Sequence, residues 1–134
     1  ALNRTIDRGV DVTIMVSSDS DIPFTPDAAL YKLHKLMKRG ATVYMYHGGF
    51  HHSKIMMVDD LFCTVGTANL TSRSLRYDDE TNAFSFDKKT TGEVNNMFRN
   101  DIEHCTELTP EFWKKRSLGK KFVGWFANLF TPFL

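Results

Sequence analysis

The sequence is poor in the features that define several large classes of protein. Its 134 residues include only two cysteines, Cys63 in an apolar run and Cys105 on a helical pattern, which argues against a disulfide framework and favours a reducing compartment. No apolar run approaches the roughly 20 residues that a membrane-spanning helix needs. The formal net charge is only +1, so the overall charge does not indicate a polyanion-binding protein. Any electrostatic signal must therefore be local.

The chain also lacks an initiator methionine, a signal peptide, an internal repeat and a low-complexity linker. It opens on ALNRTIDRGVDV, which has the pattern of a helix already under way. We therefore expect a fragment of a longer protein. The length suits one α/β domain that can bury a core of its own.

Strand and helix patterns alternate along the chain. The first two predicted helices are residues 2–8 and a segment from Thr25 to just before Gly40. A third helix is predicted to open with a Thr90–Glu93 capping box and to carry an apolar stripe that reaches Cys105. A last helical region is predicted from Thr109-Pro110 to the C-terminus, with a break near Gly119. The predicted strands are 10–17, 41–47, a hairpin of 53–59 and 61–66 that turns at Asp59-Asp60, and 82–87. Apolar strands interleaved with amphipathic helices predict a mixed α/β sheet flanked by helices on both faces.

The segment FHHSK brings two histidines and a lysine to the start of the hairpin. Side chains alternate along a strand, so His52 and Lys54 point to one face and His51 points to the other. An imidazole beside an ammonium is a poor structural pair, because burying both costs desolvation and their charges repel once His52 is protonated. The pair therefore indicates an anion held between the two side chains.

The second hairpin strand ends in Gly66-Thr67-Ala68-Asn69. Gly66 allows a close approach of the backbone, and the Thr67 hydroxyl and the Asn69 amide donate hydrogen bonds without adding charge. Such donors suit phosphate oxygens. Glu80 precedes the returning strand, where its carboxylate can accept a hydrogen bond from the second nitrogen of an imidazole and raise the basicity of the ring.

These residue types fit the needs of phosphodiester chemistry. The phosphorus is shielded by negative charge, so an enzyme must supply a nucleophile, an acid for the leaving oxygen and cationic clamps. His52 suits the nucleophile or the acid, Lys54 the clamp and Asn69 the hydrogen-bond donor, but the chain supplies each of them once. We expect no metal, because no Cys, Asp or Glu stands at a familiar ligand spacing from the histidines.

The spacing His52-x-Lys54, then Asp59, then Gly66-Thr67-Ala68-Asn69 resembles the signature of the phospholipase D superfamily. In that family two such motifs meet at one site, where one histidine forms a phosphohistidine and the other protonates the leaving group. The resemblance implies that lysine, threonine and asparagine of the motif hold the phosphate and that Glu80 orients the histidine. Asp59 has the opposite strand parity from His52 and ends the strand, so we interpret it as a structural turn residue.

The likeness extends beyond the motif. The stretches GTANLTSRS, DDETNAF and LTPEFWKKRSLGKKFVGWFANLFTPFL resemble the C-terminal half of bacterial cardiolipin synthases. The resemblance implies a phospholipase D-like fold, one half of a duplicated two-domain enzyme. It also implies transfer of a phosphatidyl group from one phosphatidylglycerol to the terminal hydroxyl of another, with release of glycerol and without a cofactor. The implied partners are the N-terminal phospholipase D domain of the same parent chain, phosphatidylglycerol and an anionic membrane surface. The chain alone is then expected to be inactive.

The C-terminal part has a character of its own, so we expect a catalytic domain in residues 1–108 and a basic, aromatic, amphipathic tail in 109–134. Five basic residues precede an aromatic stripe at helical spacing: Lys114, Lys115, Arg116, Lys120 and Lys121, followed by Phe122, Trp125, Phe126, Leu129 and Phe130. This pattern indicates an interfacial helix on an anionic leaflet, or a face that packs on the missing half of the enzyme. We expect the parent protein at the bacterial cytoplasmic membrane and the fragment itself to be soluble or peripheral.

Two other functions compete with the phosphatidyltransferase. One is a nuclease-like phosphodiesterase that completes its site by homodimerisation, which fits poorly with the near-neutral charge. The other is a non-catalytic domain that keeps the motif as an anionic-lipid site. The leading interpretation involves no nucleic acid.

Overall fold

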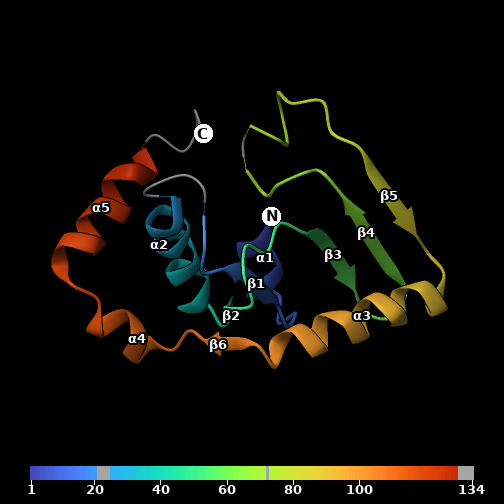
Figure 1. The fold of residues 1–134 in the computed structure, drawn as a ribbon, viewed down its shortest axis with the longest axis horizontal. Helices are drawn as coiled ribbons and strands as arrows, with labels where there is room; N and C mark the ends of the chain where they lie inside the picture. Colours follow the sequence, from blue (N-terminus) through green and yellow to red (C-terminus); the bar gives the residue numbers. More distant parts are fainter. Residues whose placement is uncertain (21–24, 72, 130–134) are drawn as a thin grey trace. The chain divides into compact units, whose positions relative to one another are not determined.

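The computed structural model describes residues 1–20, 25–71 and 73–129. The chain divides into two compact units, of which one joins residues 1–51 to the segment that begins at His104 and the other is formed by residues 52–103. Figure 1 labels their helices and strands. In the described part of the chain, no helix is long and apolar enough to cross a membrane.

The first unit contains a mixed three-stranded sheet. Strands β1 (Thr13–Ser17) and β2 (Thr42–Tyr46) run parallel, and β6 (Cys105–Glu107) pairs antiparallel with β2, so that the strand order is β1-β2-β6. The helices of this unit are α1 (Leu2–Asp7), α2 (Thr25–Met37), α4 (Pro110–Lys115) and α5 (Leu118–Leu129). The predicted mixed sheet with helices is therefore confirmed for this unit.

The core of the first unit lies where α2 meets β2. Leu30, Leu33, Val43 and Leu108 are buried together, with Val43 fully inaccessible to solvent. Helix α5 also packs along α2, as Figure 1 shows. Gly124 permits this approach, because a Cβ atom there would lie 2.5 Å from the carbonyl oxygen of Asp27.

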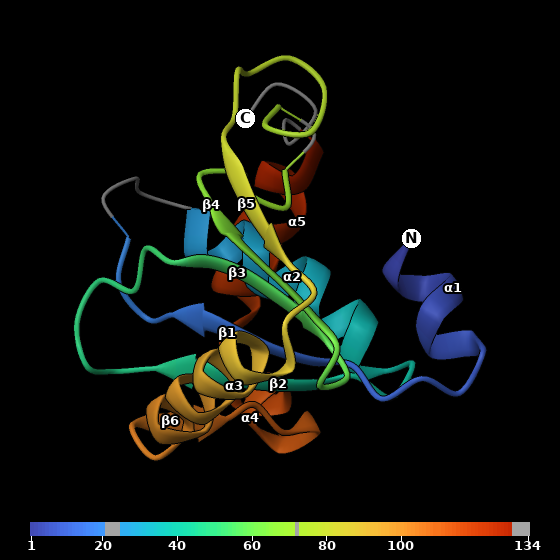
Figure 2. The same cartoon turned by 90° about the vertical axis from the view of Figure 1, so that its right-hand side faces the viewer.

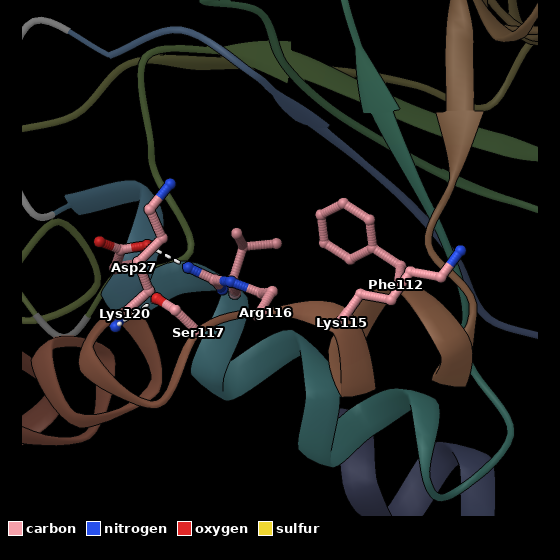
Figure 3. A pocket seen from close by; sticks show the side chains of 7 residues that line it. Asp27, Phe112, Lys115, Arg116, Ser117 and Lys120 are labelled. Atoms are coloured by element: carbon pink, nitrogen blue, oxygen red, sulfur yellow. Dashed lines mark hydrogen bonds and ion pairs between the residues drawn. The ribbon is translucent and has the colours of Figure 1, made fainter.

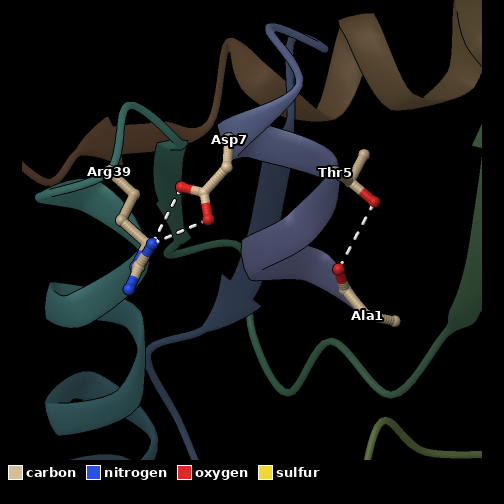
Figure 4. Close-up of polar contacts among 4 residues, drawn as sticks. All are labelled: Ala1, Thr5, Asp7 and Arg39. Atoms are coloured by element: carbon tan, nitrogen blue, oxygen red, sulfur yellow. Dashed lines mark hydrogen bonds and ion pairs between the residues drawn. The ribbon is translucent and has the colours of Figure 1, made fainter.

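An exposed ion pair joins α1 to the segment that follows α2. Arg39 Nη1 donates to Asp7 Oδ1 at 2.8 Å and to Oδ2 at 2.9 Å, as drawn in Figure 4. Gly9, at a φ of +81°, follows the end of α1 in a conformation that favours glycine. Since both partners of the ion pair are about half exposed, it contributes little stability.

The second unit is an antiparallel sheet with one helix. Strands β3 (Lys54–Val58), β4 (Phe62–Gly66) and β5 (Asn82–Ser85) lie side by side in that order, and α3 (Lys88–Ile102) follows (Figure 2). The turn between β3 and β4 contains Asp59 at a φ of +51°. Asn95 of α3 donates to Asp60 Oδ1 at 3.1 Å, which ties this turn to the helix. The predicted hairpin is confirmed.

Two predictions about local structure were wrong. The N-cap of α3 is Asp87, whose carboxylate accepts from the backbone N–H of Thr90 at 2.7 Å and from its hydroxyl at 2.8 Å, so the Thr90–Glu93 capping box does not form the helix start. Both bonds lower the pKa of the Asp87 carboxyl, and the bond from the backbone N–H of Thr90 has the larger effect. Cys105 lies in β6 and not on the stripe of α3, because the short strand pairs with β2. Among the described residues, the strands form two small sheets, β1-β2-β6 and β3-β4-β5.

Candidate functional site

The candidate residues flank one end of the β3-β4-β5 sheet. Lys54, the first residue of β3, pairs with Gly66, the last of β4, and Gly66 pairs in turn with Asn82, the first of β5. The antiparallel order therefore brings the segment before β3, the segment after β4 and the segment before β5 to the same end of the sheet. These three segments carry His52, then Thr67 with Asn69, then Glu80.

Lys54 is held against the segment before its own strand. Its Nζ donates to the carbonyl oxygen of His52 at 2.7 Å. The lysine is half-buried and His52 is exposed. An ammonium has three donors and this bond uses one of them, so the arrangement fixes the charge beside His52 and is compatible with an anion at the same place.

Hydrogen bonds from both its backbone and its hydroxyl tie Thr67 to the segment before β5. Its backbone N–H donates to the carbonyl oxygen of Thr81 at 3.0 Å, its Oγ1 accepts from the N–H of Thr81 at 3.0 Å, and the same hydroxyl donates to Glu80 Oε2. A hydroxyl has one proton to donate. A phosphate contact through the Thr67 proton would therefore require the bond to Glu80 to open.

Glu80 is half-buried and its carboxylate is oriented by Thr67. One oxygen accepts from the threonine hydroxyl, and a carboxylate has lone pairs for further donors on both oxygens. This arrangement holds a negative charge in a defined direction at the end of the sheet. It is the kind of support that keeps a neighbouring imidazole in one tautomer.

Gly66 is the last residue of β4 and lies directly against Asn82 of β5. A Cβ atom at this position would lie 2.7 Å from Asn82 Cα, and nearer still to the Thr81 carbonyl oxygen and the Asn82 side-chain oxygen. Real Cβ contacts are longer than this, so only glycine fits without a backbone shift. The motif glycine thus sets the spacing of the strands that carry the site.

Asn69 and Asp59 lie in different environments. Asn69 is exposed in the loop after β4, three residues beyond Gly66 and at the end of the sheet where Lys54 lies. Asp59 is exposed in the turn at the other end of β3. The strand thus separates Asp59 from the rest of the motif, and its positive φ fits a turn position.

Sequence reasoning missed Thr81 and Asn82. Thr81 acts through its backbone N–H and carbonyl, which every residue type carries, and Asn82 matters through its closeness to Gly66. Only the register between β4 and β5 reveals either role.

Within residues 1–20, 25–71 and 73–129, no three His, Cys, Asp or Glu side chains are placed to hold a metal ion together. The candidate residues named above contribute one imidazole, one ammonium, neutral donors and a carboxylate.

Comparison with known proteins identifies the family. The family model described as "Cardiolipin synthase, PLD-like domain" matches residues 1–102. The chain belongs to this family. The matched range includes every strand of the two sheets except β6, and it includes every residue of the candidate site.

Curated proteins that are similar to this chain are named cardiolipin synthases. The chain is 37% identical to cardiolipin synthase 1 of Staphylococcus epidermidis, over all of this chain and 27% of that protein. It is 39% identical to the cardiolipin synthase of Listeria innocua, over 94% of this chain and 26% of that protein. The chain thus spans about a quarter of the length of the curated relatives it matches.

A solved structure shares the fold. The phosphatidylserine synthase of Haemophilus influenzae Rd KW20 matches with a TM-score of 0.70 and 20% sequence identity, over 97% of this chain and 35% of that chain. This match supports the α/β fold with small sheets and flanking helices.

Proposed function

We propose that this chain supplies one of two catalytic half-sites of a cardiolipin-forming phosphatidyltransferase. The observation that carries the proposal is the meeting of the His52, Thr67–Asn69 and Glu80 segments at one end of the β3-β4-β5 sheet, in a chain of the cardiolipin synthase family. The other half-site would come from an N-terminal phospholipase D domain of the same parent chain. The chain covers 27% of a relative's length, which leaves ample room for such a domain in the relatives.

The proposed reaction proceeds in two displacements at phosphorus. In the first, the imidazole of one motif attacks the phosphorus of phosphatidylglycerol, and the imidazolium of the other motif protonates the departing glycerol oxygen. In the second, the terminal hydroxyl of another phosphatidylglycerol attacks the phosphohistidine and transfers its proton to the imidazole that acted as acid. The attacking histidine is released and cardiolipin is formed. His52 fills one of these two roles.

The other site residues act on charge and orientation. Lys54 and Asn69 would hold the non-bridging phosphate oxygens, where negative charge persists through both displacements. Glu80 would orient an imidazole and stabilise its protonated form, and Thr67 would hold Glu80 in place through the observed hydroxyl bond. No step requires a metal or an organic cofactor.

The C-terminal segment 109–134 supports a peripheral membrane contact for the parent protein. One face of α5 packs on α2, and the other presents Phe122, Trp125 and Phe126 at 61%, 45% and 50% exposure. Exposed aromatic side chains beside lysines are typical of helices that lie at a lipid headgroup layer. We propose that phosphatidylglycerol of the bacterial cytoplasmic membrane both forms the surface that this helix contacts and serves as the substrate of the enzyme.

The decisive experiment replaces His52 in the full-length parent protein. With phosphatidylglycerol vesicles, His52→Ala should lower the rate of cardiolipin formation at least ~10²-fold, while vesicle binding stays unchanged. His104→Ala is the matched control, because His104 is also exposed but lies outside the candidate site. Cardiolipin formation that survives in His52→Ala would refute the catalytic role and leave a lipid-binding domain.

A second measurement separates the proposal from a self-sufficient nuclease. Light scattering should give this chain a molar mass near 15.4 kDa, and the chain should cleave neither DNA nor phosphatidylglycerol. A dimer that cleaves nucleic acid would contradict the two-domain phosphatidyltransferase.

A further inference from the structure

Two groups of polar side chains in the first unit lie outside the candidate site. In one, Arg116 Nη2 donates to Asp27 Oδ1 in the lining of a pocket of about 410 Å³, as Figure 3 shows. This ion pair ties the segment between α4 and α5 to α2. The other group surrounds Ser17, where β1 ends, and it leads directly to the segment that carries His52.

Strands β1 and β2 run parallel and end at paired residues, Ser17 and Tyr46. The segments that follow two adjacent parallel strands leave the sheet at the same edge. The chain after β2 therefore starts beside Ser17, and it reaches His52 before β3 begins. On the way it turns at Gly49, whose φ of +116° lies in a region that favours glycine.

The half-buried Ser17 hydroxyl binds this returning segment at two places. Its Oγ donates to the carbonyl oxygen of Gly49 at 3.3 Å and accepts from the backbone N–H of His51 at 3.1 Å. The same oxygen accepts from the N–H of Asp19 at 3.2 Å. A hydroxyl has one proton and two lone pairs, so these three bonds use its whole capacity. The side chain therefore holds the backbone around it and has no donor left for a ligand.

His52 lies in a stretch whose backbone no β ladder fixes. Residues 50–53 belong to no strand, and β3 begins only at Lys54. The stretch is held on one side by the bond from the His51 N–H to Ser17, and on the other by the bond from the Lys54 ammonium to the His52 carbonyl oxygen. Bonds directly before and after a residue restrict where its side chain can lie, which is the support that a catalytic group needs.

We propose that Ser17 is a positioning residue for the reaction at His52. Its hydroxyl would not contact the substrate. It holds the backbone at Gly49 and His51 so that the imidazole of the next residue meets phosphorus or the leaving oxygen in the productive direction. Without the hydroxyl the segment can shift, and a misplacement of about 1 Å can cost ~10²-fold in rate. This inference rests on the proposed function, because Ser17 acts through the catalytic role of His52.

The test compares Ser17→Ala with Ser18→Ala in the full-length parent protein, assayed with phosphatidylglycerol vesicles. Ser18 is the matched control, because it is the next residue and its hydroxyl donates to Asp19 Oδ1 at 3.5 Å instead of binding the segment before β3. Ser17→Ala should lower kcat for cardiolipin formation at least ~10-fold and leave KM within about twofold, whereas Ser18→Ala should keep the parental kcat. Ser17→Thr retains a hydroxyl on a side chain that suits a strand, and it should restore kcat to within about threefold of the parent.

Amide hydrogen exchange of the same variants reports on the anchor independently of activity. The His51 N–H should lose protection in Ser17→Ala. The N–H of Thr42, which donates to the Val12 carbonyl oxygen at 2.9 Å at the other end of the two strands, should keep it. Unchanged protection at His51, or equal kcat values for Ser17→Ala and Ser18→Ala, would overturn the positioning role. A higher KM at unchanged kcat, or lost protection at both amides, would also overturn it, because it would mean a binding or a general structural role.

This inference and the proposed function fail separately. If His52→Ala still forms cardiolipin, the proposed function is wrong whatever the Ser17 variants do. If His52→Ala is inactive while Ser17→Ala is as active as Ser18→Ala, only the positioning role of Ser17 is wrong.

Discussion

Replacing Gly66 by alanine tests how the motif is built into the sheet. The new Cβ would lie 2.7 Å from Asn82 Cα and would also overlap the Thr81 carbonyl oxygen. These atoms are held by the pairing of β4 with β5, so relief requires the two strands to separate locally. Insertion of a methyl group into a packed position typically costs about 1–3 kcal/mol. We expect a loss of free energy of unfolding in this range for Gly66→Ala.

The matched control in the same unit is Gly92→Ala. Gly92 lies inside α3, and a Cβ there would meet no atom within 4 Å. Alanine is the better helix former by about 0.8–1.0 kcal/mol, so this variant should gain stability. The same chemical change is therefore expected to have opposite signs at the two glycines.

Urea unfolding of the 134-residue chain, followed by circular dichroism, measures both changes. Amide hydrogen exchange adds a local readout, because the N–H groups of Thr67 and Thr81 bond across the β4–β5 junction and should lose protection in Gly66→Ala. A Gly66→Ala variant as stable as the original chain, with unchanged protection of these two amides, would refute the steric account of the motif glycine.

Two further predictions concern His34 and Thr91. The pKa of His34, which stacks on Trp113, is lowered first by partial burial and then by the charges of Lys38 and Lys121, so the fold favours the neutral ring. The stability that the neutral His34 contributes should therefore be present above pH 6.5 and lost as the pH falls through the lowered pKa. In a His34→Phe variant, the unfolding midpoint should lack this part of its pH dependence. Thr91 is fully buried and its hydroxyl has no partner among the described residues, so Thr91→Val should raise the free energy of unfolding by up to ~1 kcal/mol. Thr90→Val removes the hydroxyl bond to the N-cap residue Asp87 and should lower the free energy of unfolding. If both variants lowered this free energy, the conclusion that the Thr91 hydroxyl is unpaired would be wrong.

Local signals in the sequence predicted much of the fold. Thr109-Pro110 was expected to open a helix, and Thr109 is the N-cap of α4, accepting from the N–H of Phe112 at 3.3 Å. The helix expected over residues 2–8 is α1 (Leu2–Asp7), and Gly9 after it has the positive φ that favours glycine at this position. Such features depend on residues within one or two turns of each other, and sequence reasoning can therefore reach them.

The errors arose where several local solutions compete or where a distant strand decides. Asp87 and Thr90 both suit an N-cap, and the carboxylate prevails because it binds both the N–H and the hydroxyl of Thr90. The segment Cys105–Glu107 continues the apolar pattern of α3, yet it pairs with Tyr44–Tyr46 of β2. Nothing within three residues of Cys105 signals a partner so far away in the chain.

The sequence by itself determined which chemistry the chain can contribute, because an imidazole, an ammonium and an amide are properties of residue types. Strand parity also predicts a common face for His52 and Lys54, but β3 begins at Lys54, so His52 precedes the strand and that prediction stays untested. Only the tertiary structure decided that Thr67 holds Glu80, 13 residues away, and that Arg116 meets Asp27, 89 residues away, beside a pocket. Local periodicity does not encode such pairings, because they depend on strand register and helix packing across the whole chain.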